Sequence, residues 1–222
     1  MGKVEKAIIK NFAVGLPKKM RYEDGKEMYT AIRKQQVNEA FLTKDGFQGD
    51  CVADLKHHGG PDRAVCFYSH EHYAHWNAYF EMTLPQAAFG ENVTVTNMLE
   101  QDVCIGDIFQ IGGAVIQVTQ GRVPCNTIDR RLAMKPLLKE MVKTGYTGFL
   151  CRVLDEGLVQ TDSTIRLVSK SPAQVSILYA NEVNFQRPKD IDGIMKVIEV
   201  DGLAMEWRQF LTKRLIKLTS GK

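Results

Sequence analysis

The sequence lacks long apolar runs. No stretch approaches the ~20 apolar residues that a helix needs to cross a bilayer. Near its start, the apolar run at 7–9 ends at Lys10, so the pattern of a secretory signal peptide is not met. Lys6 stands where a myristoylation motif beginning at Gly2 needs Ser or Thr. The sequence therefore predicts a cytoplasmic protein with no membrane partner.

Cysteine is scarce, and charge of one sign is nowhere concentrated. The cysteines number 5, an odd count without a Cys-x-x-Cys pair, which argues against a disulfide framework and a zinc ribbon. The 29 Lys and Arg residues nearly balance 26 Asp and Glu residues, giving a formal net charge of +3. A nucleic-acid-binding protein would carry a denser basic stripe, so we expect no nucleic-acid partner. What is present is 222 residues, 44% of them hydrophobic, enough for one or two globular domains.

Short strands broken by glycine turns are expected over residues 1–170. The stretches 93–96 and 116–119 alternate apolar and polar residues with the period of two typical of strands. Gly112-Gly113, between the strand candidates 107–111 and 114–120, predicts a hairpin. Further strand candidates are 3–10, 37–42, 64–68 and 149–154. Many short strands at close spacing are typical of a barrel or sandwich.

Two helices are expected to interrupt these strands. The first covers 69–80, with Ser69 as its N-cap and aromatic residues recurring at helical spacing. The second covers 126–143 and is expected to break or kink at Pro136, because proline removes a helical hydrogen bond.

Beyond Lys170 the pattern becomes helical. Ser171-Pro172-Ala173-Gln174 has the shape of a capping box, and further helices should follow Asp190 and Asp201-Gly202. A bundle of three short helices is marginal alone, so we expect it to need a docking surface. The predicted fold is mainly β with α: a β-barrel-like domain over 1–168, with its core at about 30–165, followed by a three-helix domain over 169–222.

The histidines number 5 and all lie between positions 57 and 75, which suggests a metal site. His70-Glu71-His72-Tyr73-Ala74-His75 resembles a zincin helix but lacks histidines at i and i+4. His75 lies about 140° around a helix from His70. His72 and His75 share a face, but two ligands do not make a zinc site. Surface or capping histidines are the simpler interpretation, and a zinc- or anion-binding module stays open as an alternative.

The segment Gly121-Arg122-Val123-Pro124-Cys125 carries the strongest chemical signal. It follows an expected strand and precedes a helix whose N-cap would be Asn126 or Thr127. The positive end of a helix dipole and nearby arginines both favour a thiolate, which is the reactive and metal-binding form of cysteine. Such a soft ligand suits a thiophilic metal. The alternative is a buried structural cysteine, an interpretation that better fits Cys51, Cys66, Cys104 and Cys151.

Three other positions are candidates for contact with a ligand. The stretch 57–63, His-His-Gly-Gly-Pro-Asp-Arg, predicts a tight turn whose N–H groups and Arg63 could cradle an anion, although an ordinary turn is the alternative. Asn92 either caps a turn or reaches into a pocket. Arg152, on an apolar strand, must find either a ligand anion or a carboxylate in a salt bridge.

These segments, in this order, resemble the MOSC family, named for the C-terminal domain of molybdenum-cofactor sulfurases. The resemblance is closest to its bacterial YiiM-like branch, which carries a three-helix C-terminal domain. The residues that carry it are Gly46-Phe47-Gln48-Gly49-Asp50, His58-Gly59-Gly60-Pro61-Asp62-Arg63-Ala64-Val65, Phe89-Gly90-Glu91-Asn92, Val103-Cys104-Ile105-Gly106-Asp107 and Arg122-Val123-Pro124-Cys125.

The resemblance implies a β-barrel-like fold that binds the molybdenum cofactor, with Cys125 as the molybdenum ligand or sulfur acceptor. It implies cofactor-pocket roles for His58, Gly59, Gly60, Arg63, Asn92 and Arg122, and less directly for Lys34 and Arg152. One departure is Gly121, where the family usually has proline. A glycine there is expected to loosen the loop that places Arg122.

Proteins of the YiiM-like branch resemble reductases of N-hydroxylated compounds such as hydroxylaminopurine-type bases. The sequence has no flavin or nicotinamide fingerprint and no iron–sulfur cysteine set, so this hypothesis requires a small-molecule substrate and a separate electron-donor protein. A second hypothesis is a carrier that holds a persulfide or the intact cofactor without turnover. The chain has no room for the pyridoxal-phosphate domain of the fusion sulfurases. A homodimer stays open.

Overall fold

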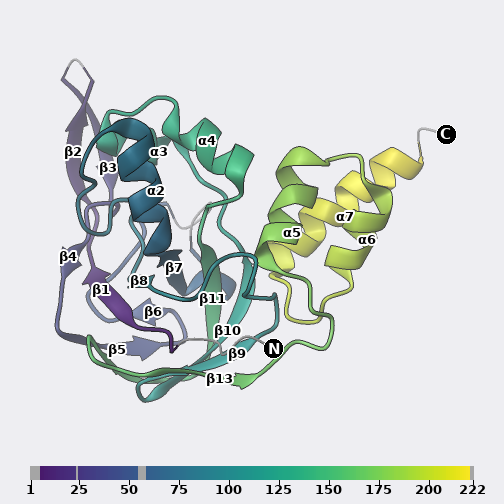
Figure 1. Ribbon diagram of the computed structural model, residues 1–222, viewed down its shortest axis with the longest axis horizontal. Coiled ribbons are helices and arrows are strands. Elements are labelled where there is room, and N and C mark those ends of the chain that lie inside the picture. The colour runs from purple at the N-terminus through teal and green to yellow at the C-terminus, as the bar shows by residue number, and fades with distance from the viewer. Residues whose placement is uncertain (1–5, 24, 55–58, 221–222) are drawn as a thin grey trace.

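The computed structural model describes residues 6–23, 25–54 and 59–220 (Figure 1). Its main element is an eight-stranded mixed sheet that curves into a half-barrel, with strand order β13-β9-β10-β11-β7-β8-β1-β4. The strands are β1 (Ile9–Val14), β4 (Gln35–Gln36), β7 (Val65–Ser69), β8 (Val93–Val95), β9 (Ile108–Ile111), β10 (Ala114–Gly121), β11 (Phe149–Asp155) and β13 (Ile165–Ser169). The predicted class, a β-barrel-like domain with a helical C-terminal region, is confirmed.

Two smaller sheets complete the β structure. One has the order β12-β5-β6 and the other pairs β2 with β3. Their bounds are β2 (Lys18–Tyr22), β3 (Lys26–Thr30), β5 (Glu39–Thr43), β6 (Gly46–Phe47) and β12 (Gly157–Gln160). The strand expected over 37–42 thus begins at Glu39. Of the strand expected over 3–10, positions 3–5 lie outside the described residues, and β1 begins at Ile9 and runs to Val14.

The connection from β7 to β8 runs through helix α2 (Glu71–Phe80), and β7 and β8 pair in parallel. Ser69 is not the N-cap of this helix. It is the last residue of β7, and its hydroxyl donates a hydrogen bond to the carbonyl of Met98 (2.6 Å). By contrast, the predicted hairpin is confirmed: β9 and β10 pair on either side of Gly112-Gly113, and Gly112 has a positive φ of 55°.

The helix expected over 126–143 is two helices, α3 (Asn126–Leu132) and α4 (Leu137–Thr144). The first ends at Ala133, which adopts a left-handed φ of 54°, so the break precedes Pro136. The N-cap of α3 is Cys125 itself rather than Asn126 or Thr127. The thiol therefore lies at the junction between strand and helix.

The C-terminal helices are α5 (Ile177–Asn181), which continues into the π-helical turn η2 (Glu182–Gln186), then α6 (Ile191–Ile198) and α7 (Met205–Thr219). The expected capping box at 171–174 does not start a helix. Ser176 caps α5 instead, accepting a hydrogen bond from Tyr179 N (3.1 Å). Asp190 caps α6 as predicted, accepting from Gly193 N (2.9 Å). None of the helices in the described ranges has the length and hydropathy of a bilayer-spanning segment.

Two apolar clusters hold these layers together. The larger is continuous from the half-barrel, through residues such as Phe67 and Phe149, into the C-terminal helices, where Trp207 and Leu211 belong to it. The smaller packs α2, α3 and α4 onto the sheet around Tyr68. In Figure 1 the C-terminal helices stand together beside the sheet, next to α4, where Gln186 of η2 donates to the carbonyl of Lys143 (2.9 Å). The docking surface expected for the short helices is therefore the half-barrel itself.

Candidate functional site

Cys125 lies four residues beyond the end of β10. That strand pairs with β11 as far as Gly121, opposite Phe149, and the chain then leaves the sheet and turns into α3. Cys125 is extended (φ −125°, ψ 160°), and its carbonyl accepts the hydrogen bond of Ile128 N (3.0 Å) that begins the helix. Its thiol is half-buried. The site thus presents sulfur at a rigid strand-to-helix junction.

Arg122 lies beside this thiol. Its backbone N–H donates a hydrogen bond to the carbonyl of Gly148 (3.0 Å), the residue before β11. The pairing of β10 with β11 therefore continues one residue beyond the strand ends. Burial by itself lowers the pKa of the guanidinium, but the nearby Cys66 and Cys125 thiols and the Glu91 carboxylate outweigh it, so the pKa of Arg122 is raised. Its Nη1 is buried with no hydrogen-bond partner among the described residues. A buried, permanently charged donor is therefore left available for an anion.

Glu91 is a buried carboxylate whose charge contributes to the raised pKa of this arginine. It is fully buried, and it accepts hydrogen bonds from the Tyr73 hydroxyl (2.5 Å), the Thr94 hydroxyl (2.8 Å) and Phe89 N (3.1 Å). Three donors hold the carboxylate in one position. In the sequence, Asn92 was the candidate within the Gly-Glu-Asn segment, and the signal for Glu91 was a carboxylate directly beside that candidate.

Asp50 brings together two of the predicted cofactor-binding residues. Its carboxylate accepts from Asn92 Nδ2 (3.0 Å) and Gly15 N (2.7 Å), and it forms an ion pair with Lys34. The other end of the Asn92 amide accepts from Cys66 N (3.1 Å). Lys34, Asn92 and Cys66 therefore form one connected network, and burial raises the pKa of the Cys66 thiol. Asp50 is the centre of this network. In the sequence it was one of the residues that carry the family resemblance, and no binding role was expected of it.

Gly121 is tightly enclosed. A Cβ added at this position would lie 2.0 Å from Oδ1 of Asn181 on α5, so no larger residue fits while that side chain keeps its place. The Asn181 amide also donates to the carbonyl of Gly145 (2.9 Å) and to the Thr147 hydroxyl (3.0 Å). The segment before Arg122 is thus braced by the C-terminal helices. The expectation that glycine loosens this segment stays a prediction.

The other predicted residues gather where the half-barrel meets α7. Arg63 donates to the carbonyl of Gly59 (2.8 Å) and pairs with Glu206 (2.7 Å). Arg152 pairs with Asp62 (2.9 Å) and also donates to the carbonyl of Gly202 (3.2 Å). The sequence left two partners open for Arg152, a ligand anion and a carboxylate. The structure contains the carboxylate, that of Asp62. Gly60 has a φ of 108°, which favours glycine. His58 lies outside the described residues.

The histidine segment places His72 in a packed pair with Glu100 rather than in a set of metal ligands among the described residues. His72 Nε2 lies 2.6 Å from the Glu100 carboxylate, and its ring stacks on Tyr146 at a centroid distance of 4.0 Å. Both His72 and Glu100 are buried. The described part of the chain contains no group of three or more His, Cys, Asp or Glu side chains that could hold a metal ion. The zinc alternative therefore has no ligand cluster there.

The residues around Cys125 suit an anionic group that binds through sulfur. The thiol can ligate a thiophilic metal, and the orphaned Arg122 Nη1 can donate to an anion beside it. Lys34 adds a nearly buried ammonium, with 6% of its side chain exposed. The molybdenum cofactor, with its phosphate and sulfur-bound metal, has this chemistry, so the donor set fits it.

Comparison with known proteins identifies a family and several relatives of this chain. Residues 54–166 match the MOSC domain family, and residues 175–217 match the YiiM-like, 3-alpha helix domain. Protein YiiM of Escherichia coli is 37% identical over 90% of this chain and 89% of its own length. A Gibberella moniliformis protein named Reductase is 37% identical over 72% of this chain but 29% of its own length. The crystal structure of YiiM from Geobacillus stearothermophilus, 29% identical, superposes with a TM-score of 0.80 over 94% of this chain and 99% of that one.

Proposed function

The chain belongs to the MOSC family, with a YiiM-like three-helix domain at its C-terminus, and on this basis we propose that it binds the molybdenum cofactor and reduces N-hydroxylated compounds. MOSC membership associates the chain with that cofactor in general. The observation that carries the proposal is the half-buried Cys125 thiol beside a buried guanidinium with an unpaired donor. The proposed substrates are small hydroxylamines of the hydroxylaminopurine type.

Cys125, its neighbour Arg122, and the Lys34 and Asn92 side chains of the network at Cys66 each have a role in this proposal. The Cys125 thiolate would ligate molybdenum. Arg122 would donate from Nη1 to an anionic part of the cofactor, with its charge balanced by Glu91. Lys34 would add positive charge from its position on Asp50, and Asn92 would keep that carboxylate in place. When bound, the cofactor supplies the two-electron redox chemistry, and the chain supplies orientation and charge.

The reaction consumes electrons that the chain must receive from outside. Reduction of R–NHOH to R–NH2 takes up two electrons and two protons, breaks the N–O bond and releases water. We propose a separate protein as the electron donor, and the fungal relative named Reductase, which is much longer than this chain, supports a reductive role. The described residues contain no disulfide, in keeping with action in the reducing cytoplasm.

The decisive experiment replaces Cys125 by serine. We expect Cys125→Ser to lose reduction of a hydroxylaminopurine while its circular dichroism spectrum is unchanged, because the sulfur ligand is gone but the fold is not. Cys104→Ser is the matched control, since Cys104 lies at a bridge to Ser176, away from α3. A chemical reductant replaces the electron-donor protein, and expression in a host that makes the molybdenum cofactor supplies the cofactor. The activity measured is then that of the chain itself. Full activity in Cys125→Ser would contradict the proposal.

A carrier without turnover is the second candidate. The same half-exposed thiol beside Arg122 would also stabilise a persulfide anion. Intact-mass measurement of freshly purified protein distinguishes the two. A stable persulfide on Cys125, together with no reduction by molybdenum-loaded protein, favours the carrier. Molybdenum content with turnover favours the reductase.

A further inference from the structure

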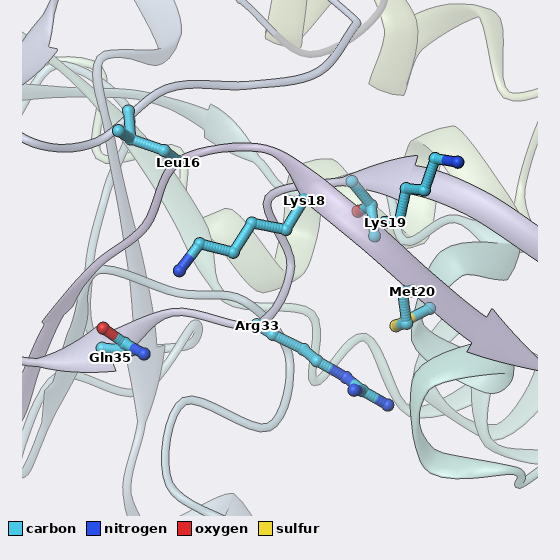
Figure 2. Close-up of a pocket in the computed structure, with 7 residues that line it drawn as sticks. Leu16, Lys18, Lys19, Met20, Arg33 and Gln35 are labelled. Atoms are coloured by element: carbon cyan, nitrogen blue, oxygen red, sulfur yellow. The ribbon is translucent and has the colours of Figure 1, made fainter.

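A hollow of about 200 Å³ opens between the β2–β3 hairpin and the chain entering β4 (Figure 2). Three of its lining residues are cations and none is an acid: it is lined by Leu16, Lys18, Lys19, Met20, Thr30, Arg33 and Gln35. The molecule as a whole carries a formal net charge of only +3. The positive charge of the hollow is therefore local.

Lys18 and Arg33 are the two cations that define this hollow. Both are exposed, and neither forms an ion pair within the part of the chain that the structure describes. Lys19 differs, because it lies 3.7 Å from Glu27 and its ammonium points away from the other two in Figure 2. Two unpaired cations at one opening attract a negatively charged partner.

Short connections lead from the hollow to the candidate site. Arg33 is followed by Lys34, which pairs with Asp50. On the other side, Arg131 of α3 bonds to the carbonyl of Ile32. Met20, at the floor of the hollow, packs in the same cluster as Ile128, which lies one helical turn after Cys125. A partner seated here would lie against the layer that holds the site.

Apolar side chains lie beside the cations. Leu16 and Met20 both line the hollow, and Leu16 is 55% exposed. A small apolar centre with charged residues around it is the composition of a transient protein–protein interface. Electron-transfer encounters are at the small end of interface sizes, and charge increases their association rates.

We propose that the Lys18–Arg33 hollow is the docking surface for an acidic electron-donor protein, a proposal that rests on the proposed reductase function. The donor loses two electrons for each N–OH group reduced, two protons come from solvent, and water leaves. Carboxylates on the donor protein pair with Lys18 and Arg33. This contact brings the donor's prosthetic group to the layer that holds the candidate site with Cys125.

The test is a charge reversal, Lys18→Glu with Arg33→Glu, studied with a chemically reduced acidic ferredoxin as the probe donor. We expect the KM for ferredoxin to rise about tenfold, because steering by local charge alters association by about 10 to 1,000-fold. The wild-type rate should fall as salt rises, and the rate of the variant should be nearly flat. Lys213→Glu with Lys217→Glu, on an exposed part of α7, makes the same change in net charge and should leave this KM unchanged.

Two further measurements separate this inference from the reductase proposal. With reduced benzyl viologen as donor, the charge-reversal variant should turn over at the wild-type rate and with the wild-type KM for the substrate. A raised substrate KM would assign the hollow to the substrate and overturn the docking proposal. Calorimetric titration of ferredoxin into the purified protein reports docking without turnover. Equal affinity for wild type and variant would overturn it even if the reductase activity stands.

Discussion

Arg122 is held from its backbone as well as through its charge. Its N–H is bonded to Gly148, and Gly148 N in turn donates to Oε1 of Glu100 (2.7 Å). The second oxygen of Glu100 pairs with His72. Glu100 therefore acts as a positioning residue, because a buried carboxylate two hydrogen bonds away sets the path of the segment that carries Arg122 and Cys125.

We predict that Glu100→Gln lowers molybdenum content and turnover and destabilises the fold by about 1–3 kcal/mol, because a charged acceptor is replaced by an amide that cannot accept from both partners. Inductively coupled plasma spectrometry and urea unfolding measure the two effects. Glu199→Gln, at an exposed carboxylate, is the control. If stability falls but molybdenum content does not, Glu100 supports the fold alone.

Cysteine reactivity is a second residue-scale prediction. Burial raises the pKa of Cys66 and Cys104, and raises that of Cys151 well above its ordinary value. Their thiolates therefore form only as pH rises above the usual range. At neutral pH we expect iodoacetamide to modify exposed Cys51 and half-buried Cys125 first.

Peptide mapping by mass spectrometry would follow this order. Cys66 and Cys104 should react faster as pH rises, and Cys151 should react only after the protein is denatured. Modification of Cys151 before Cys125 in folded protein would show that the site is less accessible than the structure indicates.

At the scale of elements, the contact between β10 and α5 determines how the Cys125 segment leaves the sheet. Asn181 fills the space beside Gly121 and holds the loop from Gly145 to Thr147. A strand from the half-barrel and a helix from the C-terminal region therefore meet at the base of the site. The packing leaves no room for a methyl group.

We predict that Gly121→Ala destabilises the protein by about 1–3 kcal/mol, because its Cβ would overlap the Asn181 amide. The double variant with Asn181→Ala should lose less than the sum of the two single variants, since removing the amide relieves the overlap. Urea unfolding of all four proteins gives the coupling free energy. Strict additivity would mean that the two residues do not compete for the same space.

At the scale of the whole molecule, the half-barrel and the C-terminal helices share one apolar core. Trp207 of α7 is 5% exposed and belongs to the same cluster as Phe67 and Phe149 of the sheet. The ion pair of Arg63 with Glu206 adds a polar link at the same boundary. Because the buried surface is continuous, the two regions should unfold together.

We predict that Trp207→Ala lowers the free energy of unfolding by about 3–5 kcal/mol, the usual cost of removing a large buried aromatic side chain. The tryptophans number 2, so this variant keeps Trp76, a buried residue of α2, as its only tryptophan. The Trp76 fluorescence should then report a transition shifted to lower urea concentration. An unshifted transition would mean that the half-barrel unfolds independently of the helices.

Local signals predicted some elements correctly because their causes are local. The Gly112-Gly113 hairpin and the Asp190 cap depend on residues within a few positions of one another. Ser69 was misassigned because its hydroxyl bonds to Met98, which lies far along the chain. The break expected at Pro136 in the helix over 126–143 lies earlier, because Ala133 adopts a left-handed conformation that its residue type does not favour.

The order of short motifs in the sequence by itself determined the family and the β-barrel-like class with its helical C-terminus, and it predicted Cys125 as the central thiol. Only the tertiary structure decided what surrounds that thiol. Glu91, Asp50 and Glu100 reach their partners across strands and loops distant in sequence, and no pattern along the chain encodes such contacts. Gly121 also has its reason in a helix 60 positions later, since Asn181 fills the space that a side chain would need.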